Sequence, residues 1–418
     1  MHAIEKLLAE KSGRDTVHAG EIVNCSVDWA GINDLYYQTV KSFYEMGGKR
    51  VAAPERAILF FDHYAPCATE KQADNHKKFR EFAREQGITH LMDINEGVCH
   101  QLMADYGFLK PGEIVVITDS HTTTHGAFGS FGTGVGATDL AIILATGKLW
   151  FKVPEVIRIN LVGTLQNGVY AKDVILHIIG DLKADYGVYK AVEFTGPVVK
   201  KLSVSERMAM CNMTTEMGAK TSYIQPDDVT LAYLKEKNIT DYKIYETDDD
   251  YEYAAELTYD VTDIGPQVAA PFSVDNVSPI EKFSGKRIQQ AYLGSCTGGR
   301  TNDFMIAAKI LKGKHIADGT RMILVPASKF VLRECIDKGY IQTLMDAGAT
   351  LTAPGCAACL GIHQGLLAEG EACISSTNRN FPGRMGNVKA EIFLASPATV
   401  AASALNGTIT NPQKYLEA

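Results

Sequence analysis

Three cysteines are the residues whose types and spacing point most directly to chemistry. Cys356 and Cys359 are three positions apart and follow a Pro-Gly pair. Cys296 lies upstream between glycines, in Gly294-Ser295-Cys296-Thr297-Gly298. Glycine beside a ligating cysteine lets the backbone approach a bulky cluster and offers bare N–H groups to its sulfides. Three thiolates with no evident fourth would hold an iron–sulfur cluster with one open iron, which is a Lewis acid.

A CxxC pair also has commoner explanations, a redox motif or half of a zinc site. Zinc would need a second CxxC or a His pair at matching spacing, and the sequence offers neither. A thioredoxin-type motif would start a helix after an early strand, far from this position. The remaining cysteines lack the glycine-rich setting, and we expect most of them to be small buried hydrophobes: Cys25, Cys67, Cys99, Cys211, Cys335 and Cys373.

Composition narrows the class of protein. The 418 residues, 46% of them hydrophobic, suit a globular protein of two to four domains. A balance of 41 basic and 49 acidic residues argues against a nucleic-acid partner. Three features predict a soluble cytoplasmic protein without membrane contact. The cysteine count is odd, the N-terminus is an amphipathic helix and not a signal peptide, and no apolar window reaches eighteen residues.

Polar side chains follow several short apolar segments that we expect to be parallel strands. The carboxyl ends of such strands are where open α/β sheets build their sites. A single loop histidine is usually structural, whereas three at one sheet edge favour a functional site. The expected strands cover residues 57–61, 89–94 and 113–118, and they are followed by Asp62-His63, by His100, and by Asp119-Ser120-His121.

A second group of polar residues lies on a predicted buried helix, residues 208–219, where Asn212 and Glu216 are four apart and share a face. Taken alone, this pair slightly favours a satisfied structural role. Near the end of the chain, Arg379 and Arg384 lie in a polar turn. With the cysteine loop just upstream, they are better candidates for carboxylate clamps than for solvated charges.

Two further stretches are interpreted without assigning chemistry to them. Residues 132–137 nominally fit the dinucleotide pattern GxGxxA, but no strand immediately precedes the first glycine, so we interpret the segment as backbone packing near a cluster or a helix start. Residues 225–285 are acidic and have few apolar runs, and we expect a solvated, partly irregular passage. From Arg287 onward, strands and helices alternate again.

The order of these motifs resembles the aconitase superfamily, in particular the large subunits of the isopropylmalate dehydratase type, over essentially the whole chain. The matching motifs are Asp62-His63, Gly97-Val98-Cys99-His100-Gln101, Thr118-Asp119-Ser120-His121-Thr122, Asn212 with Glu216, Gly294-Ser295-Cys296-Thr297, Pro354-Gly355-Cys356-Ala357-Ala358-Cys359, Asn378-Arg379-Asn380-Phe381 and Gly383-Arg384.

The resemblance implies one [4Fe–4S] cluster held by Cys296, Cys356 and Cys359, whose open iron binds the substrate hydroxyl and one carboxylate. It also implies a hydro-lyase that removes water next to a carboxylate of a small dicarboxylic acid. The implied catalytic residues are Asp62, His63, His100, Asp119, His121 and Glu216, and the implied substrate-binding residues are Ser120, Asn212, Asn378, Arg379 and Arg384.

The implied fold is α/β and aconitase-like, with three α/β domains around the cluster. We expect them at residues 1–125, 126–285 and 286–418, the last carrying the cluster cysteines. The resemblance implies that single-chain members add a swivelling fourth domain with a serine that acts as the carbon base, and we expect this chain to lack that domain. A separate small subunit is therefore the expected partner.

The sequence departs from the leucine-pathway pattern at Leu35-Tyr36-Tyr37-Gln38, where a small Thr-x-Pro turn is usual. Because this segment borders the substrate cavity in the family, we expect a 2,3-dimethylmalate type of substrate, with 3-isopropylmalate dehydratase as the alternative. The alternative to a change of substrate is that the tyrosines only repack a loop. Two other classes remain open: a non-catalytic iron–sulfur sensor and a nicotinamide dehydrogenase using residues 132–137.

Overall fold

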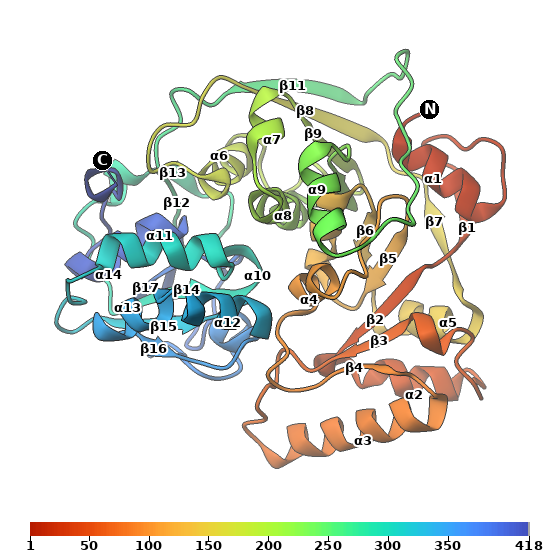
Figure 1. The fold of residues 1–418 in the computed structure, drawn as a ribbon, viewed down its shortest axis with the longest axis horizontal. Coiled ribbons are helices and arrows are strands. Elements are labelled where there is room, and N and C mark those ends of the chain that lie inside the picture. Colours follow the sequence, from red (N-terminus) through yellow and green to blue (C-terminus); the bar gives the residue numbers. More distant parts are fainter. Residues whose placement is uncertain (417–418) are drawn as a thin grey trace.

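Three α/β units follow one another along the chain in the computed structural model, which describes residues 1–416. Figure 1 shows the first unit in red and orange, the second in yellow and green, and the third in cyan and blue. Each unit contains one sheet flanked by helices. This architecture confirms the expected α/β class.

The first sheet has the strand order β4-β3-β2-β5-β6, and all its strands are parallel. β3 and β5 are buried along their whole length, as unbroken apolar strands between two helical layers should be. A small antiparallel ribbon, β1 with β7, extends this unit. The strands are β1 (Ile22–Ser26), β2 (Trp29–Asn33), β3 (Ala57–Phe60), β4 (His90–Met92), β5 (Ile114–Ile117), β6 (Phe131–Gly134) and β7 (Lys148–Lys152), and the helices are α1 (Ala3–Ser12), α2 (Gln38–Glu45), α3 (Glu70–Gln86), α4 (Cys99–Asp105) and α5 (Ala137–Thr146).

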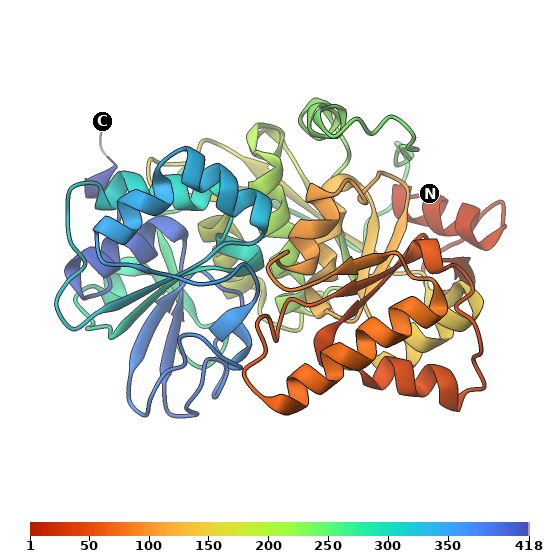
Figure 2. The same ribbon diagram turned by 60° about the horizontal axis from the view of Figure 1, so that its bottom comes forward.

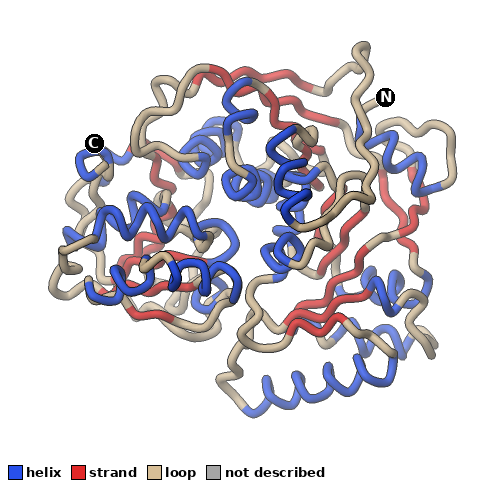
Figure 3. Tube along the Cα trace, in the orientation of Figure 1, coloured by secondary structure: helices blue, strands red, loops and turns tan. Residues whose placement is uncertain are grey.

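The second sheet has the order β10-β9-β8-β11 and is also parallel. A long loop, residues 237–254, leads from its helices back along α1 to its edge strand, and Figure 3 shows this loop in tan. The elements are β8 (Val156–Val162), α6 (Ala171–Leu182), β9 (Ala191–Thr195), α7 (Pro197–Lys201), α8 (Val204–Met213), the 3₁₀ helix η4 (Thr214–Met217), β10 (Thr221–Tyr223), α9 (Asp228–Glu236) and β11 (Ala255–Asp260).

The third sheet is the largest, with the order β13-β12-β18-β17-β14-β15-β16. β12 is antiparallel to its neighbours, and the strands from β18 to β16 are parallel. Figure 2 shows its strands beside those of the first sheet. The elements are β12 (Gln267–Ala269), β13 (Val277–Pro279), β14 (Gln290–Gly294), α10 (Ser295–Gly298), α11 (Thr301–Leu311), β15 (Arg321–Val325), α12 (Lys329–Asp337), α13 (Tyr340–Asp346), β16 (Thr350–Leu351), the 3₁₀ helix η6 (Ala357–Leu360), β17 (Ala372–Ser375), β18 (Glu391–Leu394) and α14 (Pro397–Asn406).

The prediction for residues 225–285 is wrong in part. α9, β11, β12 and β13 all lie within that passage, and β11 pairs along its whole length with β8. Every second residue of β11 is exposed because one face of this edge strand is open to solvent. The polar side chains on that face made the strand unrecognisable from composition. β12 and β13 are only three residues long, too short for a readable alternation.

The glycine-rich segment packs backbone against backbone, as interpreted from the sequence. Gly132 and Gly134 lie in strand β6, and a Cβ atom on either would come within 2.4 Å of a carbonyl oxygen. A Cβ on Gly126 would lie 2.1 Å from the Ser222 carbonyl oxygen. These glycines therefore allow close approach of chain segments, and α5 starts directly after them at Ala137.

The strands place the first change of sheet between Gly134 and Val156, and the second between Asp260 and Gln267. The domain ranges given above, with boundaries at residues 125 and 285, stay a prediction. No helix within residues 1–416 has the length and apolar character needed to cross a bilayer.

Candidate active site

A cavity of about 70 Å³ lies where the carboxyl ends of the first and third sheets meet. Strands β3, β4 and β5 lead to it from one side, and β14, β16 and β17 from the other, which is the location expected for a site in parallel α/β sheets. Its lining residues are Leu35, Tyr36, His63, Val98, His100, Asp119, Ser120, His121, Ser295, Cys296, Cys356, Cys359, Leu360, Asn378, Arg379 and Arg384.

Eleven of the fourteen residues named from the sequence line this cavity. The other three lie directly behind it. Asp62 contacts His63, Asn212 contacts Cys296, and Glu216 contacts His121. The structure thus brings together all the candidate residues, although they are spread over more than three hundred positions of the sequence.

The three cysteines are free and buried, and burial raises the pKa of the Cys296 thiol to about 11. The side-chain amides of Asn212 and Asn378 donate to Cys296 Sγ over 3.3 and 3.4 Å. Arg384 is buried beside the pair Cys356 and Cys359, and its Nε has no hydrogen-bond partner among the described residues. An unpaired buried guanidinium nitrogen and amide donors to sulfur both favour a negatively charged group in this cavity.

The backbone around the cysteines is also shaped for close approach. Ser295 and Ala357, each next to one of the three cysteines, have positive φ angles of 67° and 48°. A Cβ on Gly298 would lie 2.3 Å from the Ser376 side chain. The donor set of three thiols, amide groups and a guanidinium therefore fits an iron–sulfur cluster better than zinc, which would need a fourth ligand.

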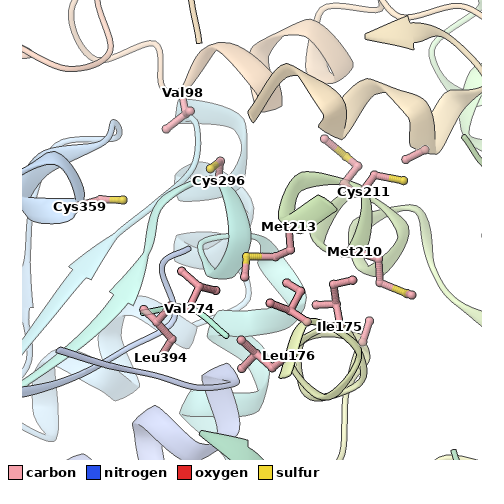
Figure 4. Close-up of a cluster of buried hydrophobic side chains, with 14 of the residues drawn as sticks. Val98, Ile175, Leu176, Met210, Cys211, Met213, Val274, Cys296, Cys359 and Leu394 are labelled. Atoms are coloured by element: carbon pink, nitrogen blue, oxygen red, sulfur yellow. The ribbon is translucent and has the colours of Figure 1, made fainter. Parts of the chain in front are cut away.

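Figure 4 shows Cys296 and Cys359 within a cluster of buried side chains that includes Met213 and Leu394. These buried apolar side chains form a wall beside the cysteines. It lowers the local dielectric constant, which strengthens each charge interaction in the cavity.

His63 is held between two carboxylates. Its Nδ1 lies 2.7 Å from Asp62 Oδ1 and 3.5 Å from Asp34 Oδ1, while its Nε2 faces the cavity, 3.7 Å from Asp119 Oδ2. Burial opposes a charge on this ring, but the charges of Asp62 and Asp34 outweigh burial and hold the pKa of His63 well above its usual value. His63 is therefore an imidazolium at neutral pH, with an N–H aimed into the cavity.

Asp34 and His76, which sequence reasoning did not select, support His63 from behind. His76 Nε2 lies 3.0 Å from Asp34 Oδ2, and its Nδ1 lies 3.1 Å from the half-buried thiol of Cys67. Burial raises the pKa of Asp34, but hydrogen bonds from His63 and His76 outweigh it and lower that pKa to about 2. Asp34 stands directly before the segment flagged as unusual, but nothing local marks it as a partner of His63.

Asp119 connects two other histidines. Its Oδ1 lies 3.2 Å from His100 Nε2 and 3.3 Å from His121 Nδ1. Burial raises the pKa of Asp119, but the charge of His100 and the hydrogen bond from His121 hold it well below its usual value. One ionised carboxylate therefore orients both rings.

Glu216 joins His121 to the arginine turn. Its Oε1 lies 2.7 Å from His121 Nε2 and accepts a 2.8 Å hydrogen bond from Arg379 Nε. Arg379 also donates from Nη2 to Ser120 Oγ over 2.9 Å. Burial raises the pKa of Glu216, but the hydrogen bond from His121 and the charges of His121 and Arg379 outweigh it and lower that pKa.

The helix expected over residues 208–219 differs in its second half. α8 ends at Met213, and Glu216 lies in the 3₁₀ helix η4 that follows. The tighter turn brings Glu216 toward His121, while Asn212 on α8 faces Cys296. The two residues thus reach the same cavity from different elements.

The fold and the cavity define a class: an α/β protein in which two parallel sheets enclose three thiols opposite several imidazole–carboxylate pairs. The chain belongs to the aconitase family, because the profile described as "Aconitase family (aconitate hydratase)" matches residues 15–287 and 281–407. It is accordingly an enzyme of the hydro-lyase type, in a family in which iron–sulfur binding is typical.

Relatives match along nearly their full length. The chain is 49% identical over 413 residues to "3-isopropylmalate dehydratase large subunit 1" of Methanopyrus kandleri, covering 99% of both chains. It is 45% identical over 419 residues to "Probable methanogen homoaconitase large subunit" of Methanothermobacter thermautotrophicus, covering 99% of this chain and 98% of the relative. It is 44% identical over 421 residues to "3-isopropylmalate dehydratase large subunit 1" of Pyrococcus furiosus, covering 100% and 99%.

Proposed function

We propose that this chain is the large, catalytic subunit of a [4Fe–4S] hydro-lyase that reversibly dehydrates an alkyl-substituted malate. One observation carries the proposal: three buried thiols with amide donors to their sulfur share one cavity with three oriented imidazoles. Dehydration of a malate needs this combination, because a poor leaving group, hydroxide, must be both polarised and protonated.

Cys296, Cys356 and Cys359 would hold the cluster, and when bound it supplies a Lewis-acidic iron for the substrate hydroxyl. His63 holds the proton for the departing hydroxide on Nε2, because Asp62 and Asp34 keep the ring charged. His100 and His121 stand across Asp119 from it and can receive or return a proton as water enters or leaves. The roles of Asp62, Asp119 and Glu216 are to orient these rings.

Arg379 and Arg384 are the positive groups available for a second substrate carboxylate. Arg379 is already fixed by Glu216 and Ser120, so its remaining N–H groups keep one direction. A fixed fork binds a carboxylate at low entropic cost. Asn212 and Asn378 hold Cys296 and complete the polar wall.

A group that removes the proton from carbon is not evident among the cavity residues of this chain. We infer that a separate small subunit supplies it, together with further contacts to the substrate. The names of the relatives describe them as large subunits, which supports this inference.

The relatives' names favour 3-isopropylmalate as the substrate over the 2,3-dimethylmalate type expected from the sequence. A specific observation keeps the second candidate: Leu35 and Tyr36 both line the small cavity. Bulky side chains there leave less room for an isopropyl group than a small turn would. Tyr37 does not line the cavity and packs at 5.3 Å edge-to-face on Phe79, so it is not a specificity candidate.

The test is a hydration assay with the chain co-expressed with the small subunit and purified without oxygen. A panel of unsaturated diacids is offered, and loss of the conjugated double bond is followed by ultraviolet absorbance. Best turnover of isopropylmaleate supports the isopropylmalate reaction, and best turnover of dimethylmaleate supports the second candidate. Absence of turnover with an intact cluster and the partner present would refute the proposal, and activity of the large subunit alone would refute the need for a partner.

A variant separates the two substrates. Tyr36→Ala enlarges the cavity wall, and Tyr44→Ala is the matched control because Tyr44 is exposed and outside the cavity. If Tyr36 limits the alkyl group, Tyr36→Ala raises kcat/KM for isopropylmaleate relative to dimethylmaleate, and Tyr44→Ala leaves the ratio unchanged. An unchanged ratio in both variants means that Tyr36 only packs the loop.

A further inference from the structure

A second cavity, of about 510 Å³, lies between the starts of helices α6, α8, α11 and α14, and Lys172 is its unusual member. Lysine ammonium groups are rarely buried without a charged partner. Lys172 is only 2% exposed, although its neighbour across the cavity, Lys309, is exposed to solvent. The burial of this one cation therefore calls for a compensating charge.

The direct partners of Lys172 do not provide that charge. Its Nζ donates to the carbonyl oxygens of Thr377 over 2.7 Å and of Ser376 over 3.3 Å, and it lies 3.4 Å from the sulfur of Met213. All three partners are neutral. They satisfy the three N–H groups of the ammonium but leave the cost of removing its charge from water.

The charges that do favour the ammonium are those of the cavity described above. Burial lowers the pKa of Lys172 to about 8, and the charges that oppose this are, in order of size, those of Cys296, Cys359, Glu216 and Asp303. The two largest come from cysteines of the proposed cluster site, which are thiolates when they bind a cluster. Asp303, the nearest acid on α11, caps its own helix by accepting from the Arg300 backbone N–H.

A short path of hydrogen bonds joins Lys172 to the cysteine loop. The Ser376 carbonyl oxygen that accepts from Lys172 also accepts from Thr297 Oγ1 over 2.8 Å, and Thr297 follows Cys296 directly. Two residues beyond Ser376, the Asn378 amide donates to Cys296 Sγ. Lys172 thus holds the segment that follows β17, which includes Asn378 and Arg379, next to Cys296. The charge of Cys296 is also the largest of those that favour the Lys172 ammonium.

We propose that Lys172 is a positioning residue for the iron–sulfur cluster, whose buried ammonium balances the charge of the thiolate-bound cluster and holds the β17 end against it. This inference rests on the proposed function in one respect, that the three cysteines bind a cluster. In the cluster-free protein with protonated thiols, the same ammonium loses the two largest of these charges and keeps only those of Glu216 and Asp303. Lys172 is therefore less favourable to stability when the cluster is absent.

Three variants test the proposal: Lys172→Met removes charge and hydrogen bonds at similar volume, Lys172→Gln removes the charge but keeps a donor, and Lys309→Met removes a solvated lysine from the same cavity. The measurements are the cluster's reduction potential by anaerobic titration, the rate of iron removal by a chelator, and the unfolding free energy of the cluster-free protein.

Both Lys172 variants should lower the reduction potential, because losing a nearby positive charge disfavours the reduced, more negative cluster. Lys172→Met should also lose iron roughly tenfold faster, since a charged hydrogen bond of about 1.5 kcal/mol or more is gone. The cluster-free Lys172→Met protein should unfold with unchanged or higher free energy, whereas a packing defect would lower it. Lys309→Met should match the unaltered protein in all three measurements.

The inference is overturned if the Lys172→Gln and Lys172→Met clusters keep the unaltered potential and iron-release rate. Should Lys172→Met not fold, Lys172→Gln decides the question by its potential alone. If the unaltered protein, reconstituted with iron and sulfide, holds no cluster, the inference and the proposed function both fail. If the cluster forms and its properties are the same in the Lys172 variants as in the unaltered protein, only the inference is overturned.

Discussion

Replacing Arg379 with lysine tests the substrate clamp, because the substitution keeps the positive charge and removes the fork. Arg379 holds Glu216 from Nε over 2.8 Å and Ser120 from Nη2 over 2.9 Å. A single ammonium cannot hold both and also point at a substrate carboxylate, so at least one charged hydrogen bond is lost. Such a bond contributes about 1.5–3 kcal/mol, which corresponds to a roughly ten- to hundredfold lower kcat/KM.

The assay is steady-state diacid hydration by the anaerobic complex, with iron content measured on the same samples. Arg321→Lys is the matched control, because Arg321 makes a similar two-nitrogen contact with Glu371 at 2.8 Å but on the surface, 46% exposed. We expect no change in kcat/KM for that variant. The reasoning is refuted if Arg379→Lys is as active as the unaltered enzyme, or if its activity falls only in proportion to lost iron.

Three further predictions concern pH, packing and the cofactor. His63 must be protonated to act as an acid, so activity should be lost as pH rises through its raised pKa. The substitution Asp34→Asn removes one of the charges that raise the pKa of His63. It should therefore move the alkaline limb of the kcat profile to lower pH. Gly126→Ala should lower the unfolding free energy by about 3 kcal/mol in a denaturant titration, because the new Cβ meets a backbone oxygen of β10 at 2.1 Å; Gly265→Ala, with no atom within 4 Å, should change it little. Cys359→Ser should abolish the visible iron–sulfur absorbance and the acid-labile sulfide after reconstitution.

Each of these outcomes could contradict the structure-based reasoning. An alkaline limb that stays in place in the Asp34→Asn variant would mean that His63 is not the group that titrates. Equal stability of the two glycine variants would contradict the close approach of the glycine-rich segment to β10. A Cys359→Ser protein that retains a full cluster would remove this cysteine from the ligand set.

Much of the site was accessible from the sequence because parallel strands have a simple geometry. A strand's carboxyl end can be read from an apolar run followed by polar residues, and parallel strands of one sheet end at one edge. Asp62, His63 and Asp119 were found in this way, and the structure places them within one cavity and its wall. The cysteines were found by their glycine setting, which is also local information. The interpretation of residues 132–137 as close backbone packing before a helix start was confirmed, although strand β6, which contains Gly132 and Gly134, was not among the expected strands.

The features that sequence reasoning missed depend on distant partners. β11 carries polar side chains because one of its faces is open to solvent, and only its pairing with β8 identifies it. His76 lies on the polar helix α3 and is recognisable only when the fold places it against Asp34.

The sequence by itself determined the chemistry: which side chains are available, which of them follow strands, and which cysteines lie in loops that can approach a cluster. The tertiary structure decided how strongly those groups act. Asp62 and Asp34 raise the pKa of His63, and Lys172 holds the carbonyl oxygens of Ser376 and Thr377 away from water, because packed sheets and helices exclude solvent from both places. The energy of a charge depends on its surroundings as much as on its type, and those surroundings are assembled from residues far apart in the chain.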